Sequence, residues 1–202
     1  QNSGKLKKEN RLYSAKIDNN KWIIEKESPS ETSNFFKVND TEIDNHKIYF
    51  LATDLEVKNF FKNSYGDCLL DLNTFSNTSP SFRCNLKVIK KNKGFSSYQS
   101  EYPFEMTKKK GSILSSLYLL TNQNASSDYL LLRNIFYKPI IEEFQLYIID
   151  IKKKEILFKE KIKSNYSNLV KIDNKFIRKD SYIFASGYLG IPIYLSEMNG
   201  NL

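Results

Sequence analysis

Histidine is almost absent from this sequence, since His46 is the only one among 202 residues. A single imidazole excludes a multi-histidine metal site, and a Ser-His-Asp or Cys-His catalytic arrangement has to use His46 itself. The seven glycines are scattered and form no phosphate-binding loop. We therefore predict no metal, no cofactor and no catalytic residue, and we expect His46 on the surface before a strand.

Long apolar segments are missing too. No run of 18 apolar residues occurs, so the sequence predicts no transmembrane segment. The chain starts with Gln1 instead of Met, which indicates proteolytic processing, and removal of a secretory signal peptide is its commonest cause. A trimmed tag or a viral maturation cleavage gives the same start. We expect an exported protein that is periplasmic, secreted or on the cell surface.

Arginine is scarce although the chain is basic, with a net charge of +8. Base recognition and bidentate phosphate contacts favour arginine, whereas lysine gives a diffuse, hydrated positive field. Nucleic acid is therefore not the partner that we expect. The four arginines are Arg11, Arg83, Arg133 and Arg178, and the other 27 of the 31 basic residues are lysines.

Only two cysteines are present, Cys68 and Cys84, and they flank the turn-forming segment SNTSPS. A return of the chain at this segment places two strands side by side. An even cysteine count in an exported chain then favours a disulfide between them. Two buried free thiols are the alternative.

Short apolar segments separated by polar turns fill the chain from residue 68 onwards. Residues 82–88 alternate apolar and polar side chains, which is the period of a half-buried strand. No 10- to 15-residue helical pattern separates the segments, so we predict an all-β, mostly antiparallel protein, either an immunoglobulin-like or a jelly-roll-like β-sandwich. The predicted strands are CLLDL, FRCNLKVIK, FSSYQSEYPFEM, SILSSLYLLT, DYLLLRNIFY, EEFQLYIIDI, EILFKEKI, NLVKI, KFI, SYIFASGY and IPIYLSE.

Two of these strands have ambiguous patterns. SILSSLYLL also fits two turns of a helix, because its apolar residues recur at helical spacing. In EILFKEKI, Glu160 interrupts the apolar face formed by Ile156, Phe158 and Ile162, which is typical of an edge strand. Strings such as SYIFASGYLGIPIYLSE are ordinary immunoglobulin-like strand sequences and do not single out one family.

Closer to the N terminus the pattern is more mixed. Residues 1–10 are polar and predict a flexible tail. Asp18-Asn19-Asn20 is a hairpin signal between two strands, and HKIYFLA is a further strand. Thr53 and Glu56 form a capping box that predicts one short helix near 53–63. We expect residues 11–202 to form a single sandwich domain, with two immunoglobulin-like units, 11–105 and 106–202, as the alternative.

Lysines gather at three places that read as turns: Lys90, Lys91 and Lys93; Lys108, Lys109 and Lys110; and Lys152, Lys153 and Lys154. Hairpin tips have to stay hydrated, and lysine discourages strand-to-strand aggregation, so solvated tips are the simplest interpretation. If several tips converge at one end of the sandwich, however, they form a site for an anionic glycan, an anionic surface or an acidic protein.

Aromatic and acidic residues offer further candidates. Trp22, Tyr98 and Tyr102 are candidates for stacking on sugar rings, although most aromatics of this chain must be structural. Paired carboxylates, as in glycoside hydrolysis, would have to come from pairs such as Asp67 with Asp71 or Glu142 with Glu143. Acids at strand ends are usually solvated, so a carboxylate-based hydrolase is only a residual alternative.

The residues together predict a non-catalytic, exported, basic structural protein of the cell surface or envelope, or of a larger particle. Its expected partner is another protein or a larger assembly, contacted through loop tips or through an edge strand. A glycan- or anionic-surface-binding module is the first alternative. A processed capsid or filament subunit is the second.

Overall fold

The computed structural model describes residues 11–28, 30–31, 36–37, 46–60, 85–89, 95–99 and 104–201. The chain divides into two compact units, 1–84 and 85–202, and each is described by itself. Almost all regular structure in the described ranges is antiparallel β, which confirms the predicted fold class. The choice between one sandwich domain over 11–202 and two immunoglobulin-like units stays a prediction.

The first unit contains a three-stranded sheet built on the predicted hairpin. β1 (Arg11–Asp18) pairs with β2 (Lys21–Lys26), and β5 (Ile48–Ala52) pairs with the other side of β1. Asn19 and Asn20 join β1 to β2 with φ angles of 48° and 58°. Two successive left-handed residues make the turn whose twist suits a two-residue hairpin, and asparagine tolerates that conformation.

Short elements complete the described part of this unit. The predicted helix is confirmed as α1 (Asp54–Phe60), which starts directly after Thr53. The Val57 N–H donates to the Thr53 carbonyl at 3.1 Å and closes the first turn. β3 (Ser30–Glu31) pairs with β4 (Phe36–Lys37). In the three-stranded sheet, Leu12 and Ala15 of β1 are buried.

The second unit begins with a hairpin of β6 (Asn85–Ile89) and β7 (Phe95–Gln99), which confirms the strand-turn-strand prediction around the first lysine turn. Lys90, Lys91 and Lys93 themselves lie outside the described residues. The expected single strand over 95–106 is wrong, because it ends at Gln99 and α4 (Phe104–Thr107) follows. Pro103 precedes α4 in the sequence, and proline has no N–H to give to a ladder.

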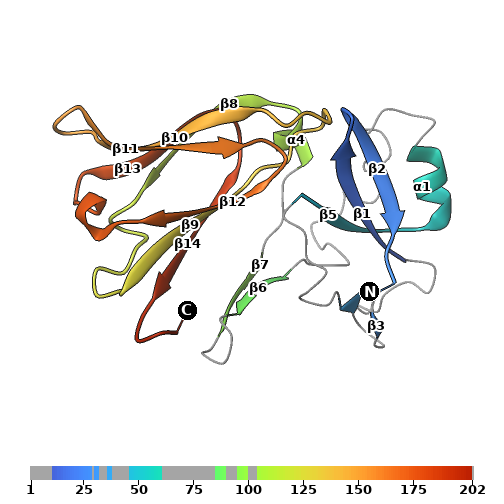
Figure 1. Cartoon of the computed structure of the whole chain (residues 1–202), viewed down its shortest axis with the longest axis horizontal. Coiled ribbons are helices and arrows are strands. Elements are labelled where there is room, and N and C mark those ends of the chain that lie inside the picture. The colour runs from blue at the N-terminus through green and yellow to red at the C-terminus, as the bar shows by residue number, and fades with distance from the viewer. Residues whose placement is uncertain are drawn as a thin grey trace, which may run out of the picture. The chain divides into compact units, whose positions relative to one another are not determined.

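Seven further strands form two sheets that enclose one core (Figure 1). One sheet has four strands in the order β11-β10-β13-β8, and the other has three in the order β12-β9-β14. The strands are β8 (Lys110–Ser116), β9 (Ser127–Arg133), β10 (Glu143–Asp150), β11 (Glu155–Lys163), β12 (Ser167–Ile172), β13 (Ser181–Tyr188) and β14 (Ile191–Glu197).

The core follows the period-two alternation of these strands. Leu146 and Ile148 of β10 point inwards from the larger sheet and are almost fully buried. Leu130 and Leu132 of β9 come from the smaller sheet, and both are completely buried. Every second residue of a strand points to the same side of its sheet, so two facing sheets close an apolar layer between them.

The strand pairing matches that of an immunoglobulin sandwich in its two central strand pairs and differs from it in the placement of the first and last strands. If β8 to β14 are taken as strands A to G, the central pairs B–E and C–F are both present as β9·β12 and β10·β13. The first strand, however, joins F, and the last strand joins B. β8 and β14 are therefore sheet edges on opposite sheets.

Local sequence explains two further differences from the predicted strands. The residues KFI were expected to be a strand, but Asn174–Phe176 form a 3-10 turn because the Asp173 side chain accepts from the Lys175 N–H. The ambiguous segment 112–120 is a strand as far as Ser116, after which the Leu120 and Thr121 amides both bond to the Leu117 carbonyl in a turn. β11 is the sheet edge that Glu160 indicated.

Candidate interaction surfaces

The outer face of the four-stranded sheet carries aromatic and aliphatic side chains where polar ones are usual. The register places Leu114, Phe184 and Tyr147 in one row across β8, β13 and β10. An adjoining row contains Tyr182, Ile149 and Ile156. We call these six residues the outer patch: Leu114, Tyr147, Ile149, Ile156, Tyr182 and Phe184.

The outer patch is open at both margins. The side chains of Leu114 and Ile156 are 61% and 64% exposed, although both are large and apolar. At the centre, the rings of Tyr147 and Phe184 stack with 6.2 Å between centroids and 29° between planes. Lys159 lies 5.8 Å from the Tyr147 centroid, so a cation borders the apolar surface. This combination of a ring pair, aliphatic margins and a basic rim suits contact with another macromolecule.

The β8 edge differs from the other three edges of the sandwich. β11 presents Lys159, Lys161 and Lys163, and β14 contains Pro192. Both devices discourage pairing with another strand. β12 carries Lys171, whereas residues 111–116 of β8 are Gly, Ser, Ile and Leu without charge or proline. Within the described sheet β8 pairs only with β13, so its second edge offers unpaired backbone groups.

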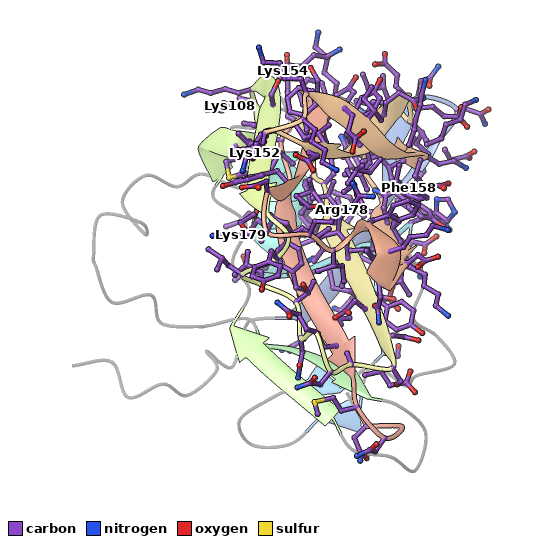
Figure 2. All side chains as sticks on the ribbon, turned by 90° about the vertical axis from the view of Figure 1, so that its left-hand side faces the viewer. Lys108, Lys152, Lys154, Phe158, Arg178 and Lys179 are labelled. Atoms are coloured by element: carbon purple, nitrogen blue, oxygen red, sulfur yellow. The ribbon has the colours of Figure 1, made fainter. Side chains whose placement is uncertain are left out.

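Three loops meet at one end of the sandwich, which we call the loop end: residues 117–126, 151–154 and 173–180. The Leu117 N–H donates to the Ser181 carbonyl at 3.0 Å, and the Ile151 N–H donates to the Asp180 carbonyl at 3.1 Å. The β8–β9 loop and the β10–β11 tip therefore both adjoin the start of β13. Figure 2 looks at this end, where Lys152, Lys154 and Lys179 are labelled.

Asp150 organises the lysine-bearing tip of the loop end. Its buried carboxylate accepts from the backbone N–H groups of Lys152 and Lys153 at 3.1 and 2.9 Å. Arg178 reaches from the β12–β13 loop to Glu155 at 2.9 Å. The three lysine side chains of the tip are exposed, and none of them forms an ion pair with a described residue.

The second lysine cluster lies at the opposite end of the same sheet. Lys110 pairs with Tyr188 at the end of β13, whereas Asp150 pairs with Ser181 at its start. An eight-residue strand such as β10 spans roughly 23 Å. The structure thus separates Lys108, Lys109 and Lys110 from Lys152, Lys153 and Lys154, and the two clusters do not converge.

Lys110 belongs to a structural network. Its Nζ lies 4.6 Å from the Tyr188 ring centroid and 3.5 Å from Glu142 Oε2. The Tyr188 hydroxyl donates to Glu142, and this bond holds the pKa of Glu142 below its usual range. Burial raises the pKa of Tyr188. The Lys161 ammonium beside Glu143, at 3.0 Å, likewise lowers the pKa of Glu143. Each of these two acids is held ionised by its own partner, which is the reverse of what a proton donor needs.

No protein-family model, curated protein or solved structure matches the chain. Its function must therefore be argued from these surfaces alone.

The other predicted site residues lie in separate elements or outside the described ranges. Trp22 is half-buried in β2 of the first unit, opposite Ile17 of β1. Tyr98 pairs with Leu86 in the β6–β7 hairpin. His46 is exposed before β5, as expected. The following residues lie outside the described ranges, so the predicted disulfide and one acid pair stay predictions: Tyr102, Cys68, Cys84, Asp67 and Asp71.

The described ranges contain neither a candidate metal-binding cluster nor a candidate membrane-spanning helix. No group of three His, Cys, Asp or Glu residues there has the geometry to hold a metal ion. In the same part of the chain, no helix is long and apolar enough to span a membrane.

A shallow groove of about 520 Å³ separates the edge strands β11 and β12. Phe158 and Leu169 give it apolar walls, and three lysines line it. Glu160 is its only acid, so it lacks the carboxylate pair that hydrolysis of a glycoside requires.

Two buried polar side chains, Asp128 and Asn165, differ in how well their hydrogen-bonding groups are satisfied. Asp128 of β9 is fully buried and accepts from Ser196, while its Oδ2 has no partner in the described part of the chain. Asn165, in contrast, receives the Phe136 N–H at 2.7 Å and donates to the carbonyls of Lys138 and Ile140. These bonds fasten the β9–β10 loop and engage the whole side-chain amide of Asn165 within the fold.

Sequence reasoning missed the outer patch, although the signal was present. In β10 the outward-facing positions contain Tyr147 and Ile149, and the inward-facing positions contain Leu146 and Ile148. In β13 the outward parity holds Tyr182 and Phe184. In a sheet with one face in solvent, each strand normally alternates apolar and polar residues. Strands that are apolar at both their odd and their even positions therefore indicate a second contact surface on the outer face.

Proposed function

We propose that this chain is a non-catalytic, exported β-sandwich module that recognises another protein through the outer patch. The observation that carries the proposal is the exposed apolar and aromatic outer face of the four-stranded sheet. Contiguous apolar surface of this kind costs free energy in water, which contact with a partner removes.

The chemistry of the patch favours a protein partner. Aromatic side chains are enriched at the centres of protein interfaces, and Tyr147 and Phe184 stand at the centre of the patch. Lys159 and Lys161 of β11 border it on one side. The partner that fits is therefore a protein with an apolar patch and acidic residues beside it, since acidic groups complement this rim.

The edge of β8 supports the same interpretation. Leu114 belongs both to the outer patch and to this uncharged edge. A partner strand that pairs with β8 gains backbone hydrogen bonds and extends the apolar face beside Leu114. Export is a separate part of the proposal, and the presence of two cysteines is compatible with it.

The alternatives have less support. Trp22 lies in β2 of the first unit, Tyr98 lies in β7 of the second, and Tyr102 is outside the described residues, so no observation supports a shared aromatic site for a glycan. A capsid or filament subunit predicts that this face binds further copies of the chain. Sedimentation of the purified chain distinguishes that alternative, because self-association depends on concentration.

Site-specific crosslinking tests the proposal. A photo-crosslinking amino acid replaces Leu114 in the source cell, and a control chain carries it at Leu169, which is also 61% exposed but lies on β12 of the other sheet. We expect one defined protein adduct from position 114 and none from position 169. In a purified mixture, Leu114→Glu with Ile156→Glu should weaken binding of that protein at least tenfold, and Leu169→Glu should not.

Adducts of equal yield at both positions would contradict the proposal, as would unchanged affinity of the double variant. An adduct only with a second copy of the chain would favour the subunit alternative. Cell fractionation tests export separately, and a chain found only in the cytoplasm would remove that part.

A further inference from the structure

We infer that the loop end is a docking site for an anionic lipid surface. This inference concerns a different part of the molecule from the outer patch, and it does not depend on the proposed protein partner. It rests on two properties that the fold brings together at one end of the sandwich: lysines without ion-pair partners and large aliphatic side chains at loop tips.

The positive charge of the loop end is only partly neutralised. The three loops contain Lys152, Lys153, Lys154, Lys175, Arg178 and Lys179, against the two acids Asp173 and Asp180. Asp173 is paired with Lys175 at 2.9 Å, and Arg178 is paired with Glu155. Among the described residues, four lysine side chains therefore face no ion-pair partner: Lys152, Lys153, Lys154 and Lys179.

Aliphatic residues protrude beside these lysines. Leu119 is 79% exposed in the turn after β8, and Leu120 and Ile151 are also exposed. Leu117 is bonded to Ser181, and Ile151 to Asp180, so the β8–β9 turn and the lysine tip flank the start of β13. Two strand spacings separate such neighbours by about 10 Å. Exposed apolar and basic residues thus lie on neighbouring loops at one end of the sandwich.

The composition distinguishes a lipid surface from a protein. Protein interfaces favour arginine and aromatic residues and are depleted in lysine. The loop end instead carries four lysines that have no acidic partner and leucine and isoleucine on protruding turns, while its one arginine, Arg178, is paired with Glu155. Lysine is attracted to anionic headgroups, and its aliphatic stem packs at the boundary between headgroups and acyl chains. Leu119 and Leu120 insert into the apolar region beneath the headgroups, so membrane attachment has a hydrophobic contribution beside the electrostatic one.

Vesicle flotation with the full chain provides the test. We expect the chain to float with vesicles that contain phosphatidylglycerol and not with pure phosphatidylcholine. Each surface lysine contributes about a fivefold change in partition, so Lys152→Gln, Lys153→Gln and Lys154→Gln together should weaken binding about a hundredfold. The matched control is the triplet Lys108→Gln, Lys109→Gln and Lys138→Gln, which removes the same charge at the opposite end, where the Tyr137 N–H bonds to the Thr107 carbonyl. Lys110 is left unchanged because it contacts Tyr188 and Glu142.

A fluorescence measurement tests insertion independently. Leu119→Trp, in a chain with Trp22→Phe, should shift its emission to the blue with anionic vesicles and be quenched by brominated acyl chains. Leu119→Ser with Leu120→Ser should reduce flotation at least tenfold, whereas Leu169→Ser should not. Circular dichroism confirms that each variant is folded.

Several results would overturn the inference. Equal flotation of the two triplet variants would show that net charge, not the loop end, drives binding. If Leu119→Ser with Leu120→Ser leaves flotation unchanged, and heparin or an acidic protein binds the same lysines, the natural ligand is a soluble polyanion and not a lipid surface. Absence of flotation at low salt would remove the site altogether.

Discussion

Arg178 Nη1 lies 3.9 Å from Asp150 Oδ2, and this pair joins the β12–β13 loop to the lysine tip at the end of β10. The Asp150 carboxylate is buried and also accepts two backbone N–H groups of the tip. One acid therefore determines the conformation of the surface that presents Lys152 and Lys153. Lys154, the next residue along the chain, completes the turn with a backbone in the left-handed region, at a φ of 57°.

We predict that Asp150→Ala lowers the free energy of unfolding by about 2 to 3 kcal/mol, because two amides lose a buried acceptor and the Arg178 guanidinium loses a nearby carboxylate. Chemical denaturation and hydrogen exchange of the tip amides measure the effect. Glu160→Ala, an exposed acid on β11, should change stability by less than about 0.5 kcal/mol. Equal losses in the two variants would show that Asp150 has no special role.

Asp128 should respond in the opposite way. Its Oδ2 is buried without a partner in the described part of the chain, and a buried carboxylate in that state costs free energy. We expect Asp128→Asn to leave stability unchanged or to raise it by about 1 kcal/mol, since the amide keeps the acceptor for Ser196. Thermal and chemical denaturation measure it. A loss above about 2 kcal/mol would reveal a partner for Oδ2.

Asn165 should be among the most sensitive polar residues of the second unit. It is buried, has φ of 52°, and bonds to the Phe136 amide and to two carbonyls. Asn165→Ala should cost about 3 kcal/mol, because it leaves these groups unpaired and strains the backbone. Asn165→Gly removes only the bonds and should cost less. Asn124→Ala, in an exposed sequence of the same Asn-x-Ser type, should be nearly neutral.

The first unit should lose stability in alkaline solution. Burial raises the pKa of Tyr13 from 10.0 to about 12, and its hydrogen bond to Asp54 acts in the same direction. A raised pKa means that the folded unit favours the neutral phenol. The contribution of Tyr13 to the free energy of unfolding is therefore complete below pH 10 and is lost as the pH rises to about 12.

The Tyr13 prediction is measured by tyrosinate absorbance and by Trp22 fluorescence, which reports on the first unit because Trp22 is the single tryptophan. Tyr13→Phe should remove one group that titrates late and should flatten the alkaline loss of stability. An unchanged titration curve in this variant would assign the late ionisation to another tyrosine.

Local patterns predicted the elements well where one interaction dominates. Asn19 and Asn20 specify a two-residue hairpin because asparagine tolerates positive φ, and the turn has that form. Thr53 marks the start of α1 because its carbonyl accepts the first helical bond. Predictions failed where a side chain captured the backbone instead, as Asp173 does when it converts KFI into a 3-10 turn.

By itself, the sequence determined the β class, the hairpins and the exclusion of a multi-histidine metal site, since these depend on residue type and on nearest neighbours along the chain. Strand order and register decided everything about the surfaces. The lysine triplets at 108–110 and 152–154 look equivalent in sequence, yet antiparallel pairing through β13 places them at opposite ends of one sheet. The outer patch likewise exists because β8, β13, β10 and β11 align residues up to 70 positions apart in the chain, between Leu114 and Phe184. Such long-range alignment follows from the shared burial of the core, which no local pattern encodes.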